Sequence, residues 1–231
     1  MNIIVNGGSK GIGREVVLCL SGDKDHQLLV TGRKTELLKE LQLECTNENV
    51  TYLPMDISSL DNKIENIKDQ IYNRFSRVDI LINIAGLLIV RDFEKISSQE
   101  AHDMMETNFF GPAFFTKLLI PLMPINSHII NISSMGGFQG SGKYAGLSFY
   151  SASKAALASL TECLAVELGG KAISVNCLAL GSVQTDMFET AFPGYKASVT
   201  PREIAEFISY FAINGNRFFN GKILPVAVNN P

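Results

Sequence analysis

Short apolar runs alternate with amphipathic stretches along almost the whole chain. The runs are rich in Ile, Val and Leu, whereas the stretches between them carry apolar residues at three- and four-residue steps, the period of a helix with one buried face. Continuous apolar runs are typical of strands that helices cover on both faces. The pattern predicts an α/β fold of Rossmann type, doubly wound, with a seven-stranded parallel sheet and helices on both faces. The predicted strands cover residues 2–6, 27–32, 50–55, 78–86, 127–133, 173–180 and 221–228.

No linker or low-complexity stretch interrupts this alternation, so we expect a single domain over residues 1–231. A length of 231 residues is typical of one α/β domain. The most apolar region, 109–125, contains three prolines and Lys117. We therefore expect a core helix there and not a membrane span.

Charge and cysteine usage exclude several classes of protein. A net charge of −3, without a run of Lys or Arg, argues against a nucleic-acid partner. The three histidines are isolated and the cysteines are widely scattered, so we expect no metal site. No secretory segment follows Met1, which favours a cytoplasmic protein with reduced thiols. The cysteines are Cys19, Cys45, Cys163 and Cys177.

The first predicted strand runs into a glycine-rich turn that opens a helix. Gly7, Gly11 and Gly13 form the pattern G-x-x-x-G-x-G between "NIIVN" and "REVVLCL". Such a turn lets the backbone approach a pyrophosphate, while the helix N–H groups point at its oxygens. This position favours a dinucleotide site, and a glycine turn without a ligand is the alternative.

The end of the second strand indicates which nucleotide this turn would hold. Gly32 stands where an acid would bind the ribose diol of NAD, and Arg33 follows it. Together with Lys10 in the glycine turn, Arg33 favours NADP(H), because a guanidinium can pair with the additional phosphate. Two solvated cations are the alternative. Asp56, after the third strand, is predicted either to accept a hydrogen bond from the adenine amine or to cap a helix.

Tyr150 and Lys154 are four residues apart in a long helical pattern, so they share one helix face. A nearby ammonium lowers the pKa of a phenol, which makes Tyr150 the candidate proton donor. Tyr144 has Ser148 at the same offset and lies in a Gly-rich segment. We expect Tyr144 to be at most a substrate contact.

Taken in order, these motifs resemble the short-chain dehydrogenase/reductase family over nearly the whole chain, and in particular its 3-oxoacyl-acyl-carrier-protein reductases. The glycine turn is similar to the family's motif, with Asn6 where threonine is usual. "NIAG" resembles the Asn-Asn-Ala-Gly motif with Ile84 in place of the second asparagine, and Leu180 replaces the proline of a Pro-Gly pair, which predicts a less constrained backbone there. The family's catalytic positions fall on Asn108, Ser134, Tyr150 and Lys154.

The resemblance implies a mechanism and a set of cofactor contacts. Ser134 would position a carbonyl, Tyr150 would protonate its oxygen, Lys154 would bind the nicotinamide ribose, and Asn108 would anchor a water that relays protons. It also implies a homodimer or homotetramer, paired through residues 98–120 and 150–169. The implied cofactor-binding residues are Gly7, Ser9, Lys10, Gly11, Ile12, Gly13, Arg33, Asp56, Ile57, Asn83, Ala85, Gly86, Tyr150, Lys154, Gly181, Val183 and Thr185.

The segment 186–200 is expected to decide the substrate. Phe188, Phe192 and Tyr195 suggest an apolar lid with a hinge-like turn at 193–194, or aromatic residues that only pack the loop. The predicted function is NADPH-dependent reduction of a carbonyl, a ketone or a 3-oxoacyl thioester, to an alcohol. A non-catalytic NADPH-binding sensor and a non-redox dehydratase or epimerase are the alternatives. No membrane partner is expected.

Overall fold

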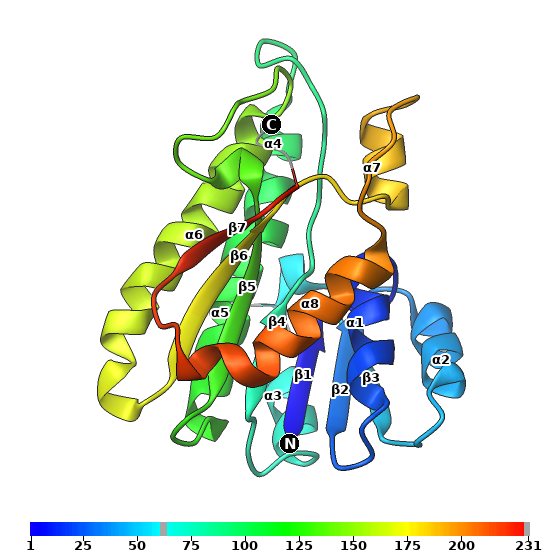
Figure 1. Cartoon of the computed structure of the whole chain (residues 1–231), viewed down its shortest axis with the longest axis vertical. Helices are drawn as coiled ribbons and strands as arrows, with labels where there is room; N and C mark the ends of the chain where they lie inside the picture. Colours follow the sequence, from blue (N-terminus) through cyan, green and yellow to red (C-terminus); the bar gives the residue numbers. More distant parts are fainter. Residues whose placement is uncertain (61–63, 229–231) are drawn as a thin grey trace.

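The computed structural model describes residues 1–60 and 64–228 (Figure 1). Seven parallel strands form one sheet in the order β3-β2-β1-β4-β5-β6-β7. The predicted doubly wound α/β fold with a seven-stranded parallel sheet is therefore confirmed. The strands are β1 Asn2–Asn6, β2 Gln27–Gly32, β3 Val50–Pro54, β4 Ile80–Asn83, β5 His128–Ser134, β6 Ser174–Leu180 and β7 Ile223–Val226.

Four of these strands, β3, β4, β6 and β7, are shorter than the sequence predicts. β4 ends at Asn83 and not at residue 86, because the backbone N–H groups of Ile84 and Ala85 both donate to the Asn6 carbonyl, at 2.9 and 2.8 Å. The chain thus leaves the sheet beside the end of β1. β1 and β4 are neighbours from which the chain winds in opposite directions, the place where open α/β sheets bind ligands.

Alternate side chains of each strand enter two separate apolar cores, as the period of a strand requires. Ile3 and Val5 of β1 face the core beneath α1, α2 and α8, whereas Ile4 faces the core beneath α3, α5 and α6. Figure 1 shows α1 and α8 crossing in front of the strands. The bounds are α1 Gly11–Ser21, α2 Thr35–Glu44, α3 Ile64–Tyr72, α5 Gly111–Leu119, α6 Ser148–Glu167 and α8 Pro201–Asn214.

Two further helices lie between β4 and β5 and after β6. α4 (Ser98–Met105) begins with a capping box between Ser97 and Glu100 and continues through a π-helical turn, 106–110, into α5. α7 (Asp186–Ala191) follows β6. α8 has Pro201 in its first turn, a position where proline is favoured. Within the described ranges, no helix is both long and apolar enough to cross a membrane.

Candidate active site

The glycine turn after β1 has a backbone that side chains would not permit. Gly7 and Gly11 have positive φ angles of 97° and 56°. A Cβ on Gly7 would lie 2.5 Å from the Ala85 nitrogen, and one on Gly13 would lie 2.2 Å from the Gly7 oxygen. Lys10, the N-cap of α1, makes no side-chain capping bond, so the first N–H groups of α1 are not capped by it. The turn fits a pyrophosphate group at the N-terminus of α1.

The end of β2 lies against this turn. A Cβ on Gly32 would lie 3.0 Å from Cβ of Ser9, so the two segments touch and bring Lys10 and Arg33 to the same region. Both cations are exposed, and neither forms a salt bridge with any residue that the structure describes. The region therefore offers positive charge without a neutralising carboxylate.

Three predicted cofactor contacts have their side chains engaged within the protein. Asp56 caps a short 3₁₀ turn, 57–59, and accepts from the backbone N–H and the hydroxyl of Ser58 at 3.1 and 2.8 Å. Asp56 therefore does cap this turn, through Oδ1, and its contact with the adenine amine stays a prediction. Ile57 and Val183 are buried in the two apolar cores. Their side chains support the backbone there and are not presented to a ligand.

Asn83 belongs to a row of buried amides across the sheet. Its Nδ2 donates to Oδ1 of Asn131 at 2.9 Å and to the hydroxyl of Thr116 at 3.1 Å. Its Oδ1 accepts from Asn6, which in turn accepts from Thr31 at 3.0 Å. Asn83 is 1% exposed and its side chain is engaged within the sheet, so its contact with the cofactor stays a prediction. The row instead holds the ends of β1, β4 and β5 together beneath the glycine turn.

The four predicted catalytic residues lie at the carboxyl end of β5. Ser134 ends β5, accepts from the Gly136 N–H at 3.1 Å, and lies beside Tyr150 in the first turn of α6. Lys154 lies one turn further along α6 and is buried. A Cβ on Gly86 would lie 3.4 Å from Nζ of Lys154 and 3.5 Å from Oδ1 of Asn108. The turn after β4 therefore runs directly beside both groups.

Burial dominates the proton affinities at this site. It raises the pKa of Tyr150, and the hydrogen bond with Ser134 offsets this only in part. Burial also lowers the pKa of Lys154 to about 8, and its Nζ donates to the Ile132 carbonyl at 2.9 Å. The pKa of Tyr150 is therefore raised overall, because desolvation is the largest influence on it, and the expected lowering by Lys154 stays a prediction. Tyr150 is a protonated phenol at neutral pH and can donate.

Asn108 lies in the π-helical turn between α4 and α5 and is completely buried. Its Oδ1 accepts from the Leu87 N–H at 2.7 Å, and its Nδ2 donates to the Leu87 carbonyl at 2.8 Å and to the Ser153 hydroxyl at 2.9 Å. Both amide hydrogens are thus used within the protein. The expected water cannot be anchored by these hydrogens, so the amide serves to join three segments around Lys154.

A family model described as short chain dehydrogenase matches residues 1–196. The chain belongs to the short-chain dehydrogenase family. An uncharacterized oxidoreductase of Staphylococcus saprophyticus is 31% identical over 228 residues, which cover 92% of this chain and 89% of that protein. NADPH-dependent aldehyde reductase 1 of Arabidopsis thaliana chloroplasts is 27% identical over 243 residues, covering 96% and 83%.

Solved structures of this family superpose over nearly the whole chain. A short-chain dehydrogenase from Burkholderia cenocepacia, in complex with NADP, has a TM-score of 0.87 at 23% identity and covers 97% of this chain and 95% of its own. ElxO with NADP bound has a TM-score of 0.84 at 25% identity, covering 98% and 96%. The chain is therefore an oxidoreductase of the short-chain dehydrogenase family, and homologues of it bind NADP.

Leu180, which replaces a proline of the short-chain dehydrogenase motif, is the last residue of β6. It is buried and pairs with Ser134 of β5 on one side and Val226 of β7 on the other. The Gly181 N–H also donates to the Val226 carbonyl, at 2.9 Å. β5 and β7 thus flank Leu180 in the sheet, and the expected loss of constraint in the backbone stays a prediction.

The segment after β6 forms a loop closed at its base. Val183 and Val199 form a parallel bridge, and Gln184 Oε1 accepts from the Ala197 N–H at 2.7 Å. Thr185 caps α7 and approaches the glycine turn, 3.7 Å from the position of a Cβ on Gly11. Of the expected lid residues, the rings of Phe188 and Phe192 lie 5.3 Å apart, whereas Tyr195 is 72% exposed.

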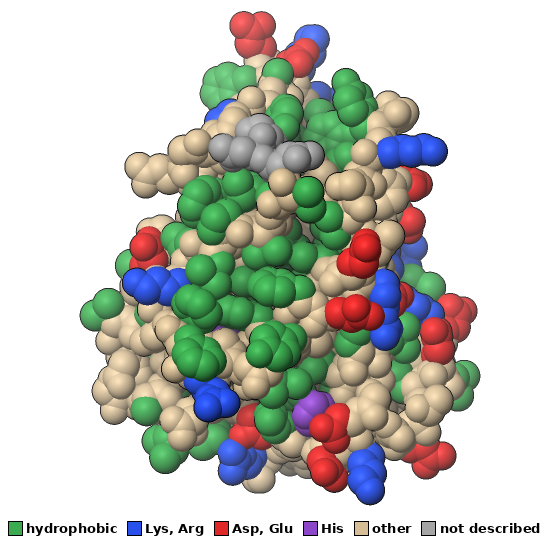
Figure 2. All heavy atoms as spheres, viewed as in Figure 1, with side chains coloured by type: hydrophobic (Ala, Val, Ile, Leu, Met, Phe, Trp, Pro, Cys, Tyr) green, Lys and Arg blue, Asp and Glu red, His purple; other side chains and the backbone are tan. Residues whose placement is uncertain are grey.

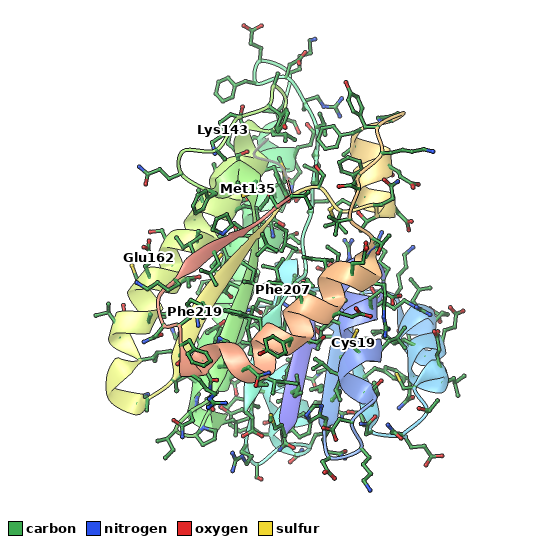
Figure 3. The ribbon with its side chains drawn as sticks, in the orientation of Figure 1. Cys19, Met135, Lys143, Glu162, Phe207 and Phe219 are labelled. Carbon is green, nitrogen blue, oxygen red and sulfur yellow. The ribbon has the colours of Figure 1, made fainter. Side chains whose placement is uncertain are left out.

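Sequence reasoning missed two short contacts that build this end of the short-chain dehydrogenase fold. A Cβ on Gly137 would lie 2.6 Å from the Ala155 nitrogen, so only glycine allows the segment after β5 to lie against α6 beside Lys154. Phe93 stacks on Phe149 with centroids 5.9 Å apart, which attaches the loop after β4 to the start of α6. The pair Gly136–Gly137 was the available signal for the first contact. Figure 3 labels Met135 and Lys143, which both lie in the segment between β5 and α6.

Proposed function

We propose that this protein is an NADPH-dependent reductase of a carbonyl compound. The observation that carries the proposal is the placement of Ser134 beside Tyr150 and the buried Lys154, at the same sheet edge as the glycine turn. When bound, NADPH supplies a hydride to the carbonyl carbon. Tyr150 gives its phenolic proton to the carbonyl oxygen, so that a C–H and an O–H bond form and the product is an alcohol.

Each side chain has a role that its surroundings support. Ser134 orients the carbonyl oxygen toward Tyr150, since its side chain lies beside the phenol. Lys154 uses one of its hydrogens for the Ile132 carbonyl and keeps two for ribose hydroxyls. Because the pKa of Tyr150 is raised by burial, the phenol is fully protonated at neutral pH. The Lys154 ammonium then stabilises the Tyr150 phenolate that forms as the proton leaves.

We propose NADP(H) over NAD(H) because positive charge without a neutralising acid lies at the end of β2. Arg33 and Lys10 are exposed and the position before Arg33 is glycine, so the region suits a phosphate rather than a ribose diol. The Arabidopsis relative is NADPH-dependent by name, and two of the solved relatives hold NADP. Arg33→Ala should weaken NADPH use by about tenfold to a hundredfold and leave NADH use unchanged. Lys39→Ala, an exposed cation of α2, is the matched control.

For the substrate we propose a 3-oxoacyl thioester first, with ketones and aldehydes as the further classes. The aromatic residues of the 186–200 loop support an apolar substrate, and the Arabidopsis relative is named as an aldehyde reductase. The test is NADPH oxidation by the purified protein with an acetoacetyl thioester, several ketones and several aldehydes, with NADH in parallel. Tyr150→Phe is the control.

Oxidation of NADPH by the wild type, lost in Tyr150→Phe, would support the reductase and name the substrate class. Tight NADPH binding with no oxidation by any carbonyl would contradict it and favour the NADPH-binding sensor. Conversion of an alcohol or sugar without net NADPH oxidation would favour a dehydratase or epimerase.

We also propose that the protein is a cytoplasmic, single-domain homo-oligomer paired through residues 98–120 and 150–169. Within these two ranges, the side chains of Phe110 and Val166 are 37% and 82% exposed. Figure 2 shows that apolar side chains also gather over α8 and β7, where Phe207, Tyr210 and Phe218 are exposed. Light scattering of the wild type and of Val166→Glu tests the proposed pairing, and Tyr210→Glu tests the other face. A mass changed only by Tyr210→Glu would overturn the proposed pairing.

A further inference from the structure

Ser153 is a buried serine between Tyr150 and Lys154, and the mechanism above gives it no role. It is 0% exposed and lies on α6 immediately before Lys154. Its hydroxyl donates to the Tyr150 carbonyl at 2.7 Å and accepts from Nδ2 of Asn108 at 2.9 Å. One hydroxyl therefore connects the catalytic helix to the π-helical turn.

The direction of these bonds follows from the chemistry of a serine inside a helix. The single hydroxyl hydrogen is used by the carbonyl three residues earlier, which leaves the oxygen lone pairs to face outward from α6. Asn108 can then only donate to Ser153. Its other two bonds are to the N–H and the carbonyl of Leu87, which fix the amide orientation. The hydroxyl of Ser153, the amide of Asn108 and the backbone of Leu87 therefore have hydrogen-bond partners in one arrangement only.

These hydrogen bonds from Ser153 through Asn108 to Leu87 fix how far the segments around Lys154 lie from one another. Leu87 follows Gly86, whose backbone runs beside Lys154 Nζ, and Asn108 Oδ1 lies on the same side of Gly86. Loss of the Ser153 hydroxyl would leave one buried hydrogen of Asn108 without an acceptor and release α6 from the turn. Tyr150 and Lys154 would then move relative to the 84–90 backbone, where the proposed function places the cofactor and carbonyl.

We propose that Ser153 is a positioning residue for proton transfer, acting through Asn108 and Leu87. The proposal rests on the proposed reductase function. Ser153→Ala should lower kcat by about tenfold to a hundredfold, since a displacement of about 1 Å can cost that much, while the KM for NADPH stays within about twofold. Ser153→Thr keeps the hydroxyl in a helix and should restore most of kcat. Ser159→Ala, an exposed serine of the same helix, is the matched control.

A second measurement does not depend on turnover. Hydrogen–deuterium exchange of the wild type, Ser153→Ala and Ser159→Ala should show faster exchange at residues 84–90 and 106–110 in Ser153→Ala alone, because the Leu87 N–H is held by the Asn108 oxygen. Unchanged exchange in those segments would overturn the proposal whether or not the protein is active.

The kinetic outcome separates this proposal from the reductase itself. An active wild type, an inactive Tyr150→Phe and a Ser153→Ala with normal kcat would retain the reductase and reject Ser153 as a positioning residue. If the wild type oxidises no NADPH, the reductase fails and Ser153 is judged by exchange alone. A fall in kcat that Ser153→Thr does not restore, with Ser159→Ala normal, would also count against the hydroxyl.

Discussion

Two buried titratable side chains lie near opposite ends of β5. Burial lowers the pKa of both, but they have different roles. His128 begins the strand, and Lys154 of α6 binds the Ile132 carbonyl close to its other end. Burial lowers the pKa of His128 to about 4 and that of Lys154 to about 8. Desolvation alone therefore does not identify a catalytic group.

The difference lies in the hydrogen bonds that remain free. The His128 ring uses both nitrogens: Nδ1 bonds the Ala212 carbonyl at 3.0 Å, and Nε2 accepts from Asn176 at 3.0 Å. Lys154 uses one of its three hydrogens in the hydrogen bonds of the structure. A buried group with all its partners inside the protein stabilises the fold, whereas one with free hydrogens can act on a ligand.

The largest effect is expected at the carboxyl end of β5. Tyr150→Phe removes the proton donor and should lower kcat by about 10²–10⁴, with the melting temperature and NADPH affinity close to wild type. Steady-state kinetics and a fluorescence titration with NADPH measure both. A variant that keeps a tenth or more of kcat would show that another group protonates the oxygen.

The pH profile of kcat/KM should show the ionisation of Lys154. If its ammonium is needed, kcat/KM should fall about tenfold per pH unit above about 8, because Lys154 loses its charge there while the pKa of Tyr150 is raised. Lys154→Arg keeps a charge at every accessible pH, so the fall should disappear or move upward in that variant. A fall near pH 8 that persists in Lys154→Arg would assign it to another group.

At the amino end of β5 we expect the reverse result, a loss of stability without a loss of activity. His128→Ala opens a cavity beside Phe211 and removes partners from Ala212 and Asn176. The free energy of unfolding should fall by about 2–4 kcal/mol, with kcat at 25 °C unchanged. Urea unfolding and steady-state kinetics of the same preparation check this. A kcat loss comparable to that of Tyr150→Phe would break the contrast between the two ends.

His128 should also make stability depend on pH. Its pKa is 6.5 in the unfolded chain and about 4 in the folded protein, so the unfolded chain binds more protons between these values. Stability is retained above pH 6.5 and is lost as the pH falls toward 4, by at most about 3 kcal/mol. Urea unfolding from pH 4 to 7 should show this slope in the wild type and a smaller one in His128→Gln.

The smallest effect is expected at Cys177, the buried thiol that lies near Lys154. Burial raises the pKa of Cys177 to about 11, above the value of about 8 for Lys154. The thiol is therefore neutral while Lys154 titrates. Cys177→Ala should leave the pH profile of kcat/KM unchanged and lower the free energy of unfolding by about 1 kcal/mol. A displaced profile would show that the thiol does influence the ammonium.

The amino-acid sequence by itself determined the fold and most of the candidate site. The apolar runs required covered parallel strands, and the glycine pattern placed a turn whose close contacts at Gly7 and Gly13 the structure confirms. The i, i+4 spacing brought Tyr150 and Lys154 to one face of α6. These features depend on local periodicity and backbone geometry, which neighbouring residues in the chain decide.

Only the tertiary structure decided what surrounds those residues. It showed that burial raises the pKa of Tyr150, that Leu180 pairs with β5 and β7, and that Asn83 lies within a row of amides. It also brought Ser153 to Asn108, 45 residues away. Desolvation and hydrogen bonds between distant segments depend on how the elements pack together, and no spacing within one element reveals them.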